Sequence, residues 1–271
     1  AALMGKVEPL SLGMVFLALV WYMQGRNFWG AAFLLAWTAS WKFQWLPFLG
    51  LFATVAFVRQ DRSLQKFLGA VALLLLVFFA FPFALLPFER VWEAHQAWFN
   101  TLDAVVEIYW SIEHNLFVPF RKIFGNGMTL RHVHNLGLLL GVVFFLITMA
   151  ATFISRKERL WVPVLFSLSL GTGYYVLFSP MSQAPGYLLG CPLLLLANVF
   201  RTEEKSAWPI KRGTVLLTLY WLMSGWIFSD LSPAVLRAWA HEYKTLPLAY
   251  FVLLIVTLVA FFRKYLPANV T

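Results

Sequence analysis

The chain has 271 residues, 61% of them hydrophobic and only 12% charged, with a formal net charge of +9. A soluble domain carries about a quarter charged residues, so the composition excludes a soluble globule of this size. The apolar residues form continuous runs rather than alternating ones, which excludes a β-barrel, since a backbone in lipid must satisfy its own hydrogen bonds as helices or as a closed barrel.

Nine apolar runs predict the helices. A helix needs ~20 apolar residues to cross ~30 Å of hydrocarbon, and the second and third runs are short enough for a re-entrant pair. The runs cover residues 10–24, 28–41, 45–58, 67–86, 136–154, 160–178, 186–200, 213–228 and 246–262. We therefore predict an all-α integral membrane protein, a polytopic bundle of about 8–9 transmembrane or re-entrant helices forming a single domain over residues 1–271.

The connections between the runs predict an orientation. If nine spans alternate, one side receives 13 of the 21 basic residues and four acidic ones, so the whole net charge lies on that side. Basic residues are enriched in cytoplasmic connections, so we expect the N-terminus outside and the C-terminus in the cytoplasm, in a bacterial inner membrane. Short basic clusters beside spans suit anionic lipid headgroups, and we expect no nucleic-acid partner.

The longest connection, residues 87–135, lies on the predicted outer side and is both charged and aromatic. A long connection in a chain of short loops is usually functional or disordered, and its aromatic residues argue against disorder. Residues 92–110 are expected to form an amphipathic helix on the membrane surface.

Lysines and acidic residues at the outer ends of the spans are candidate site residues. Lys6 and Glu8 precede the first run, and Lys42 and Gln44 separate the second from the third. A lysine at a span end often only reaches the headgroups. Two lysines on one face with several carboxylates nearby suit a phosphate instead.

The long connection adds acid–base groups and cations. Glu107, Glu113 and His114, with Asn115 beside them, are candidates for proton transfer near neutral pH, although a solvated loop explains them equally well. Further basic residues suit phosphate or lipid headgroups: Arg121, Lys122 and Arg131. His132 and His134 are two residues apart and would lie on opposite sides of a helix, so no metal site is expected. A divalent cation has no support in the sequence, and no cofactor is predicted.

Residues 179–187, a turn with two prolines and a glycine, follow the sixth run. The segment reads as a connector, or as a cavity rim lined by the polar Ser179, Ser182, Gln183 and Tyr187. Cys191, the one cysteine, reads as packing. The sequence contains no Walker loop, dinucleotide fingerprint, zinc-protease motif or nucleophile elbow.

Several short motifs resemble the family-87 type of GT-C glycosyltransferases, over about the first 200 residues. They are Gly5-Lys6-Val7-Glu8-Pro9-Leu10, Gly25-Arg26, Trp29-Gly30-Ala31-Ala32-Phe33, Trp41-Lys42-Phe43-Gln44-Trp45-Leu46-Pro47, Ile112-Glu113-His114-Asn115-Leu116 and Ser179-Pro180-Met181-Ser182. The chain departs from the family pattern at Lys6 and Glu8, which replace a glutamine and an asparagine. It departs again at residues 184–186, where the family often has a histidine pair.

The resemblance implies transfer of a sugar from a polyprenyl-phosphate carrier, with inversion, at the outer face. It implies Lys42 and Arg121 as phosphate contacts, with Glu8, His114, Ser182 and Tyr187 lining the sugar and acceptor pocket. The family's catalytic acid precedes the matched motifs, so residues upstream of Ala1 would supply it. Two alternatives stay open: a non-catalytic subunit that binds lipid or joins a membrane complex, and a transporter or flippase of lipid-linked material.

Overall fold

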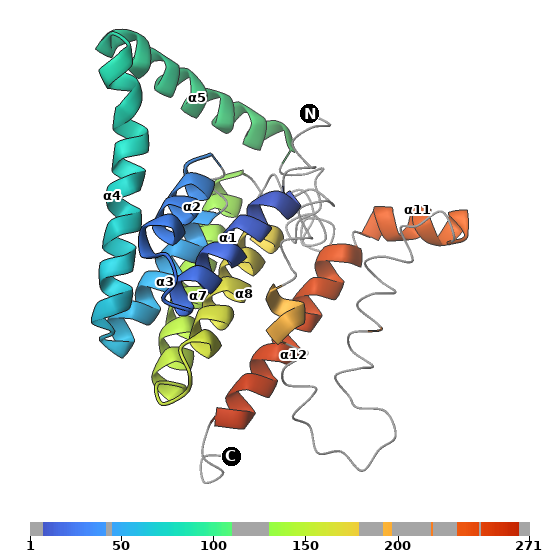
Figure 1. The fold of residues 1–271 in the computed structure, drawn as a ribbon. Helices are drawn as coiled ribbons and strands as arrows, with labels where there is room; N and C mark the ends of the chain where they lie inside the picture. The colour runs from blue at the N-terminus through green and yellow to red at the C-terminus, as the bar shows by residue number, and fades with distance from the viewer. Residues whose placement is uncertain are drawn as a thin grey trace.

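The computed structural model describes residues 8–41, 45–109, 130–178, 192–196, 218, 232–243 and 245–265. All regular secondary structure within these residues is helical (Figure 1). The helices are α1 (Glu8–Met23), α2 (Phe28–Trp41), α3 (Leu46–Arg59), α4 (Arg62–Leu85), α5 (Phe88–Tyr109), α7 (Leu130–Ile154), α8 (Trp161–Phe178), α11 (Ala234–Tyr243) and α12 (Thr245–Tyr265).

Seven of the nine predicted runs coincide with helices: α1 to α4, α7, α8 and α12. The runs 186–200 and 213–228 fall largely outside the described residues. Four of the described helices are long and apolar enough to cross a membrane: α4, α7 from Asn135, α8, and α12 from Leu246. The described part of the chain is thus all-α and integral to a membrane, while the predicted count of 8–9 spans stays a prediction.

The short helices α2 and α3 have 14 residues each, or about 21 Å at 1.5 Å per residue, less than the ~30 Å of a bilayer core. They do not pack mainly on each other. Helix α2 lies against α1 and α4, whereas α3 lies against α7 and α8. Each is held by longer neighbours, which is how a short helix keeps its place in a bundle.

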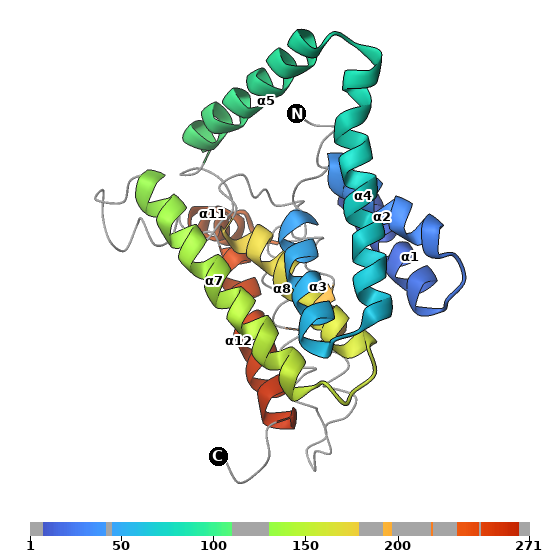
Figure 2. The same cartoon turned by 90° about the vertical axis from the view of Figure 1, so that its left-hand side faces the viewer.

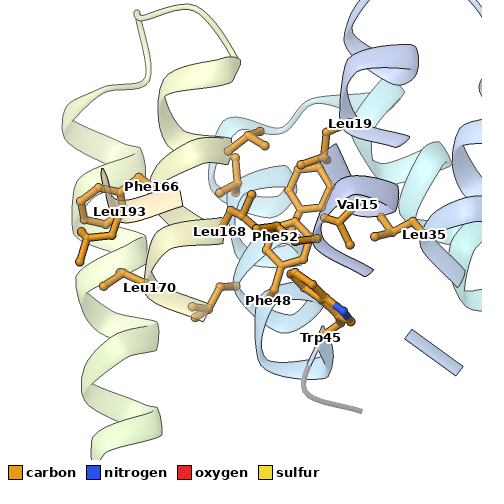
Figure 3. Close-up of a cluster of buried hydrophobic side chains, with 14 of the residues drawn as sticks. Val15, Leu19, Leu35, Trp45, Phe48, Phe52, Phe166, Leu168, Leu170 and Leu193 are labelled. Carbon is orange, nitrogen blue, oxygen red and sulfur yellow. The ribbon is translucent and has the colours of Figure 1, made fainter. Parts of the chain in front are cut away.

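Helices α3 and α8 cross with their backbones close together. A Cβ atom on Gly171 would lie 2.5 Å from the Cα of Phe48, so the two backbones meet where α8 has no side chain. Helix α8 is buried along most of its length, and Phe166, Leu168 and Leu170 join the core around Phe48 and Phe52 (Figure 3). Small residues permit this close approach in membrane proteins, where packing replaces the hydrophobic effect between helices.

Aromatic rings connect the two halves of the bundle. Phe48 stacks on Phe52 with centroids 5.3 Å apart, Phe52 meets the edge of Phe67 at 6.5 Å, and Phe67 stacks on Tyr22 at 4.2 Å. These rings come from α3, α4 and α1 in turn. Ring pairs of this kind contribute ~0.5–1.5 kcal/mol beyond area burial. This row of four rings therefore stabilises the packing of α1 and α4 against the α3–α8 core.

The buried hydroxyl groups of the helices are mostly satisfied within their own helix. Thr38, Thr54, Thr148, Ser169 and Thr257 each donate to the carbonyl oxygen four residues earlier, at 2.6–3.0 Å. A polar group in hydrocarbon needs such a partner. These residues therefore belong to the scaffold and do not form a polar pathway through the bundle.

The turns at one end of the bundle are joined by hydrogen bonds. The Arg59 guanidinium donates from Nη1 to the carbonyl oxygens of Glu158 at 3.1 Å and Ser155 at 3.4 Å, which links the α3–α4 turn to the α7–α8 turn. Asp61 accepts from the backbone N–H of Leu64 and so caps α4. This end is fixed by contacts between sequence segments about 100 residues apart.

Candidate functional site

The other end of the bundle collects the segments that carry the predicted site residues. Four helices begin at this end, namely α1, α3, α7 and α12, and three helices end there, namely α2, α4 and α8. Helix α5 extends across this end, from the end of α4 towards the start of α7 (Figures 1 and 2). The segments 1–7, 42–44, 110–129 and 179–191 all attach to these helix ends. We refer to this end as the α5 end and to the opposite one as the turn end.

Most predicted site residues lie outside the described residues, so their positions stay predictions. They are Lys6, Lys42, Gln44, His114, Asn115, Arg121, Ser179, Ser182, Gln183 and Tyr187. Glu8 is the first residue of α1. The structure therefore brings together the helix ends next to these residues, while the side chains themselves lie outside the described residues.

The two histidines of the long connection fall within α7. His132 is exposed, and His134 is two positions further along the same helix, which places the two positions about 200° apart around the helix axis. Within the described ranges, no group of three His, Cys, Asp or Glu side chains is suitably placed for a metal ion.

A corner of aromatic rings sets the direction of α5. Phe83, in the last turns of α4, packs against Phe88 at 5.3 Å and stacks on the ring of His95 at 5.7 Å, and Phe88 stacks on Trp92 at 6.3 Å. The His95 ring nitrogen Nδ1 also lies 2.7 Å from the carbonyl oxygen of Val91. Pro87 stands directly before α5, where a missing backbone N–H costs no helical hydrogen bond.

One face of α5 is polar and acidic. At 3.6 residues per turn, six polar positions fall within an arc of about 80°, and they are Glu89, Glu93, Gln96, Asn100, Asp103 and Glu107. Val91, which is buried, lies on the opposite side of the helix, and Trp92, which is exposed, lies next to the edge of the polar arc. An amphipathic helix is thus present where the sequence predicted one, while its position on the membrane surface stays a prediction. Interfacial helices usually carry Lys and Arg on the polar face, whereas this one carries carboxylates.

The start of α3 contains a buried donor that the sequence did not single out. Trp45 is fully buried, and its indole Nε1 has no hydrogen-bond partner among the described residues. It occupies the N-cap position of α3, where its side chain makes no capping bond. The motif Trp41–Pro47 predicted a site in this segment on the basis of Lys42 and Gln44. Nothing in the sequence distinguishes a buried tryptophan from an interfacial one.

The turn end carries the opposite charge. Nine basic and two acidic residues lie there among those described: Arg26, Arg59, Arg62, Lys66, Arg156, Lys157, Arg159, Arg263 and Lys264, with Asp61 and Glu158. At the α5 end the described helices carry six acidic and three basic residues: Glu8, Glu89, Glu93, Asp103, Glu107 and Glu242, with Arg90, Arg131 and Arg237. The expected separation of charge is therefore present in the fold.

Fold and charge together define a polytopic helical membrane protein whose charged groups are divided between the two ends of its bundle. No family model, curated protein or solved structure matches the chain. The resemblance to GT-C glycosyltransferases therefore stays a prediction.

Proposed function

We propose that this protein transfers a sugar from a polyprenyl-phosphate-linked donor to a lipid or glycan acceptor, at the α5 end of its bundle and on the outer face of a bacterial inner membrane. The observation that carries the proposal is that the four segments bearing the candidate residues attach to helix ends on this one side. The sequence motifs suggest the chemistry, and the attachment of these segments to neighbouring helix ends supports a common location for it.

A lipid-linked donor suits a site at the end of helices. The polyprenyl chain stays in hydrocarbon while its phosphate stays at the interface, so the phosphate must be bound at the level where helices end. Helix α4 offers lipid a large apolar face, with Leu73, Leu76 and Phe81 each more than half exposed. Such a surface allows the donor to approach from within the bilayer.

The proposed reaction is a displacement at the anomeric carbon. The acceptor oxygen forms a bond to that carbon, the bond from the carbon to the phosphate oxygen breaks, and polyprenyl phosphate leaves with inversion of configuration. A carboxylate takes the acceptor proton, a role for which Glu8 is the candidate, with His114 as an alternative base. Lys42 and Arg121 neutralise the charge that develops on the leaving phosphate.

The described helix interiors argue against ion-coupled transport. Residues 67–85, 135–154, 161–178 and 246–262 contain no Asp, Glu, Lys, Arg or His. Proton and ion pathways use ionisable groups or unwound backbone near the membrane centre. Sugar transfer at one end of the bundle needs neither ionisable groups nor unwound backbone near the membrane centre.

The test uses the full-length protein in vesicles with radiolabelled polyprenyl-phosphate sugars and a cell lipid extract, with products identified by mass spectrometry. Lys42→Ala should lower the transfer rate roughly 10- to 100-fold, because a hydrogen bond to a charged group is worth ~1.5–3 kcal/mol. Lys66→Ala, which removes an exposed lysine at the turn end, should transfer at the wild-type rate.

Two results would contradict the proposal in different ways. A Lys42→Ala variant with wild-type rates would remove the phosphate role of Lys42. A wild-type protein that binds the lipid carrier but forms no product with any donor and acceptor would instead identify a non-catalytic subunit.

A further inference from the structure

The connection between α7 and α8 concentrates positive charge at the turn end of the bundle (Figure 1). Arg156, Lys157 and Arg159 follow one another closely there, and all three are exposed. Among the described residues none forms an ion pair with these side chains, not even Glu158, which stands between two of them. Asp61, the other described acid at this end, accepts a hydrogen bond from the backbone as the cap of α4. The three cations therefore remain available to an anion from outside the chain.

Hydrogen bonds hold the backbone of this connection in place. The Arg59 guanidinium donates from Nη1 to the carbonyl oxygens of Ser155 and Glu158, at 3.4 and 3.1 Å. The Glu158 N–H donates to the carbonyl oxygen of Ser155 at 2.9 Å, and the Val162 N–H donates to that of Arg159 at 3.0 Å. Because the backbone is already ordered, less conformational entropy is lost when its cationic side chains bind one ligand together.

Arg156 lies over an aromatic ring at the end of α7. Its guanidinium carbon is 4.9 Å from the centre of the Phe153 ring, and Phe153 is 59% exposed. A guanidinium is attracted to the face of an aromatic ring, and its N–H groups lie in a plane whose geometry matches the oxygens of a phosphate. Phe153 therefore favours a position of Arg156 at the boundary between the apolar surface of α7 and the charged connection.

A continuous apolar face of α7 leads to that ring. Leu139, Val142, Leu146 and Phe153 fall within about 60° of one another around the helix axis, and each is 55–60% exposed. Such a helix face in a bilayer contacts acyl chains, which are as apolar as leucine. An apolar face that ends in three unpaired cations matches an amphiphile with a negative headgroup better than it matches a soluble anion.

We propose that the connection between α7 and α8 binds an anionic phospholipid, with the headgroup phosphate on Arg156, Lys157 and Arg159 and an acyl chain along the adjoining face of α7. Basic residues beside a span are attracted to anionic lipid in general. The ring under Arg156 and the hydrogen-bonded backbone make this place a site rather than part of a diffuse charge. The proposal is independent of sugar transfer and concerns the opposite end of the bundle.

The test measures binding of phosphatidylglycerol to the purified, delipidated protein in detergent by native mass spectrometry. The triple variant Arg156→Ala, Lys157→Ala and Arg159→Ala should bind about 100-fold more weakly, since each basic residue near an anionic lipid adds a similar increment of affinity. All three side chains are exposed, so the unfolding midpoint should stay at the wild-type value.

A second triple variant is the matched control. Arg26→Ala, Arg62→Ala and Lys66→Ala remove the same charge from exposed positions at the same end of the bundle. This variant should bind phosphatidylglycerol like the wild type. Equal losses of affinity in the two triple variants would show a diffuse electrostatic attraction and would overturn the site.

Two conservative variants test the geometry rather than the charge. Arg156→Lys keeps the positive charge but loses the planar guanidinium, and Phe153→Leu keeps an apolar side chain but loses the ring. Each should lower the affinity about 2- to 5-fold, the effect of an exposed cation–π contact. Wild-type affinity in both variants would overturn the role of the ring and leave charge alone to explain binding.

Two further probes identify the ligand. Phosphatidylcholine has the same chains and a phosphate but a neutral headgroup overall, so it should bind at least about 10-fold more weakly. Inorganic phosphate lacks the chains and should not displace phosphatidylglycerol at equal concentration. Equal binding of phosphatidylcholine would assign this surface to ordinary lipid contact, and displacement by inorganic phosphate would assign it to a free anion. Either result would overturn the proposal.

Discussion

At the scale of single residues, the bundle depends on a few positions where bulk is forbidden or required. Gly171 is the clearest, because its missing side chain lets α8 touch the backbone of α3. A Cβ there would meet the Cα of Phe48 at 2.5 Å and its backbone nitrogen at 2.8 Å. Neither atom can move without shifting the whole of α3.

Gly171→Ala should therefore destabilise the protein by about 1–3 kcal/mol, the usual cost of overpacking a core. The measurement is thermal or denaturant unfolding in mild detergent. Gly69→Ala is the matched control, since a Cβ at Gly69 meets nothing within 4 Å and alanine favours the helix. If both variants unfolded at the same midpoint, the α3–α8 contact would be looser than described.

The sequence could not identify these residues, for a physical reason. Gly171 looks like any small residue within an apolar run, and its partner Phe48 is 123 positions away in the chain. Trp45 stands at the end of an apolar run, as Trp29 and Trp41 do, yet Trp29 is 61% exposed and Trp41 is 41% exposed, whereas Trp45 is buried. Burial of one tryptophan among many depends on tertiary contacts that no local pattern records.

At the scale of helices, the apolar runs in the sequence predicted the positions of the helices well and the residues at which the helices begin and end less well. The predicted run 28–41 coincides with α2, but α4 begins at Arg62 rather than at 67, and α7 at Leu130 rather than at 136. In both cases the run was cut at charged or polar residues, Lys66 and Asn135, whereas the helix continues through them. Asp61 caps α4, and capping depends on backbone geometry rather than on hydropathy. Helix α11, short and amphipathic, was not expected at all.

Helix α5 depends on the aromatic corner at its start. Its described contact with α4 rests on Phe83, Phe88 and His95, so Phe83→Ala should release it. A nitroxide attached at Asn100, exposed on the polar face of α5, should then report greater mobility as a narrower electron paramagnetic resonance line. Phe81→Ala, at a neighbouring residue 58% exposed, should leave the line unchanged. An unchanged line in both variants would mean that α5 is held elsewhere.

At the scale of the whole molecule, charge separation should decide how the bundle sits in the membrane. Lys and Arg beside spans remain in the cytoplasm, and the turn end carries nine basic residues against two acidic ones among those described. The acidic face of α5 fits the opposite side, since it gains nothing from an anionic cytoplasmic leaflet. We therefore expect the turn end to face the cytoplasm.

Single cysteines introduced into a Cys191→Ser background test this orientation. Gln96→Cys on α5 and Gln24→Cys at the α1–α2 turn are matched substitutions at exposed glutamines on opposite ends of the bundle. In intact spheroplasts a membrane-impermeant maleimide should label Gln96→Cys, and it should label Gln24→Cys only after permeabilisation. The reverse pattern would place α5 in the cytoplasm, and sugar transfer at the α5 end would then need a donor presented on that side.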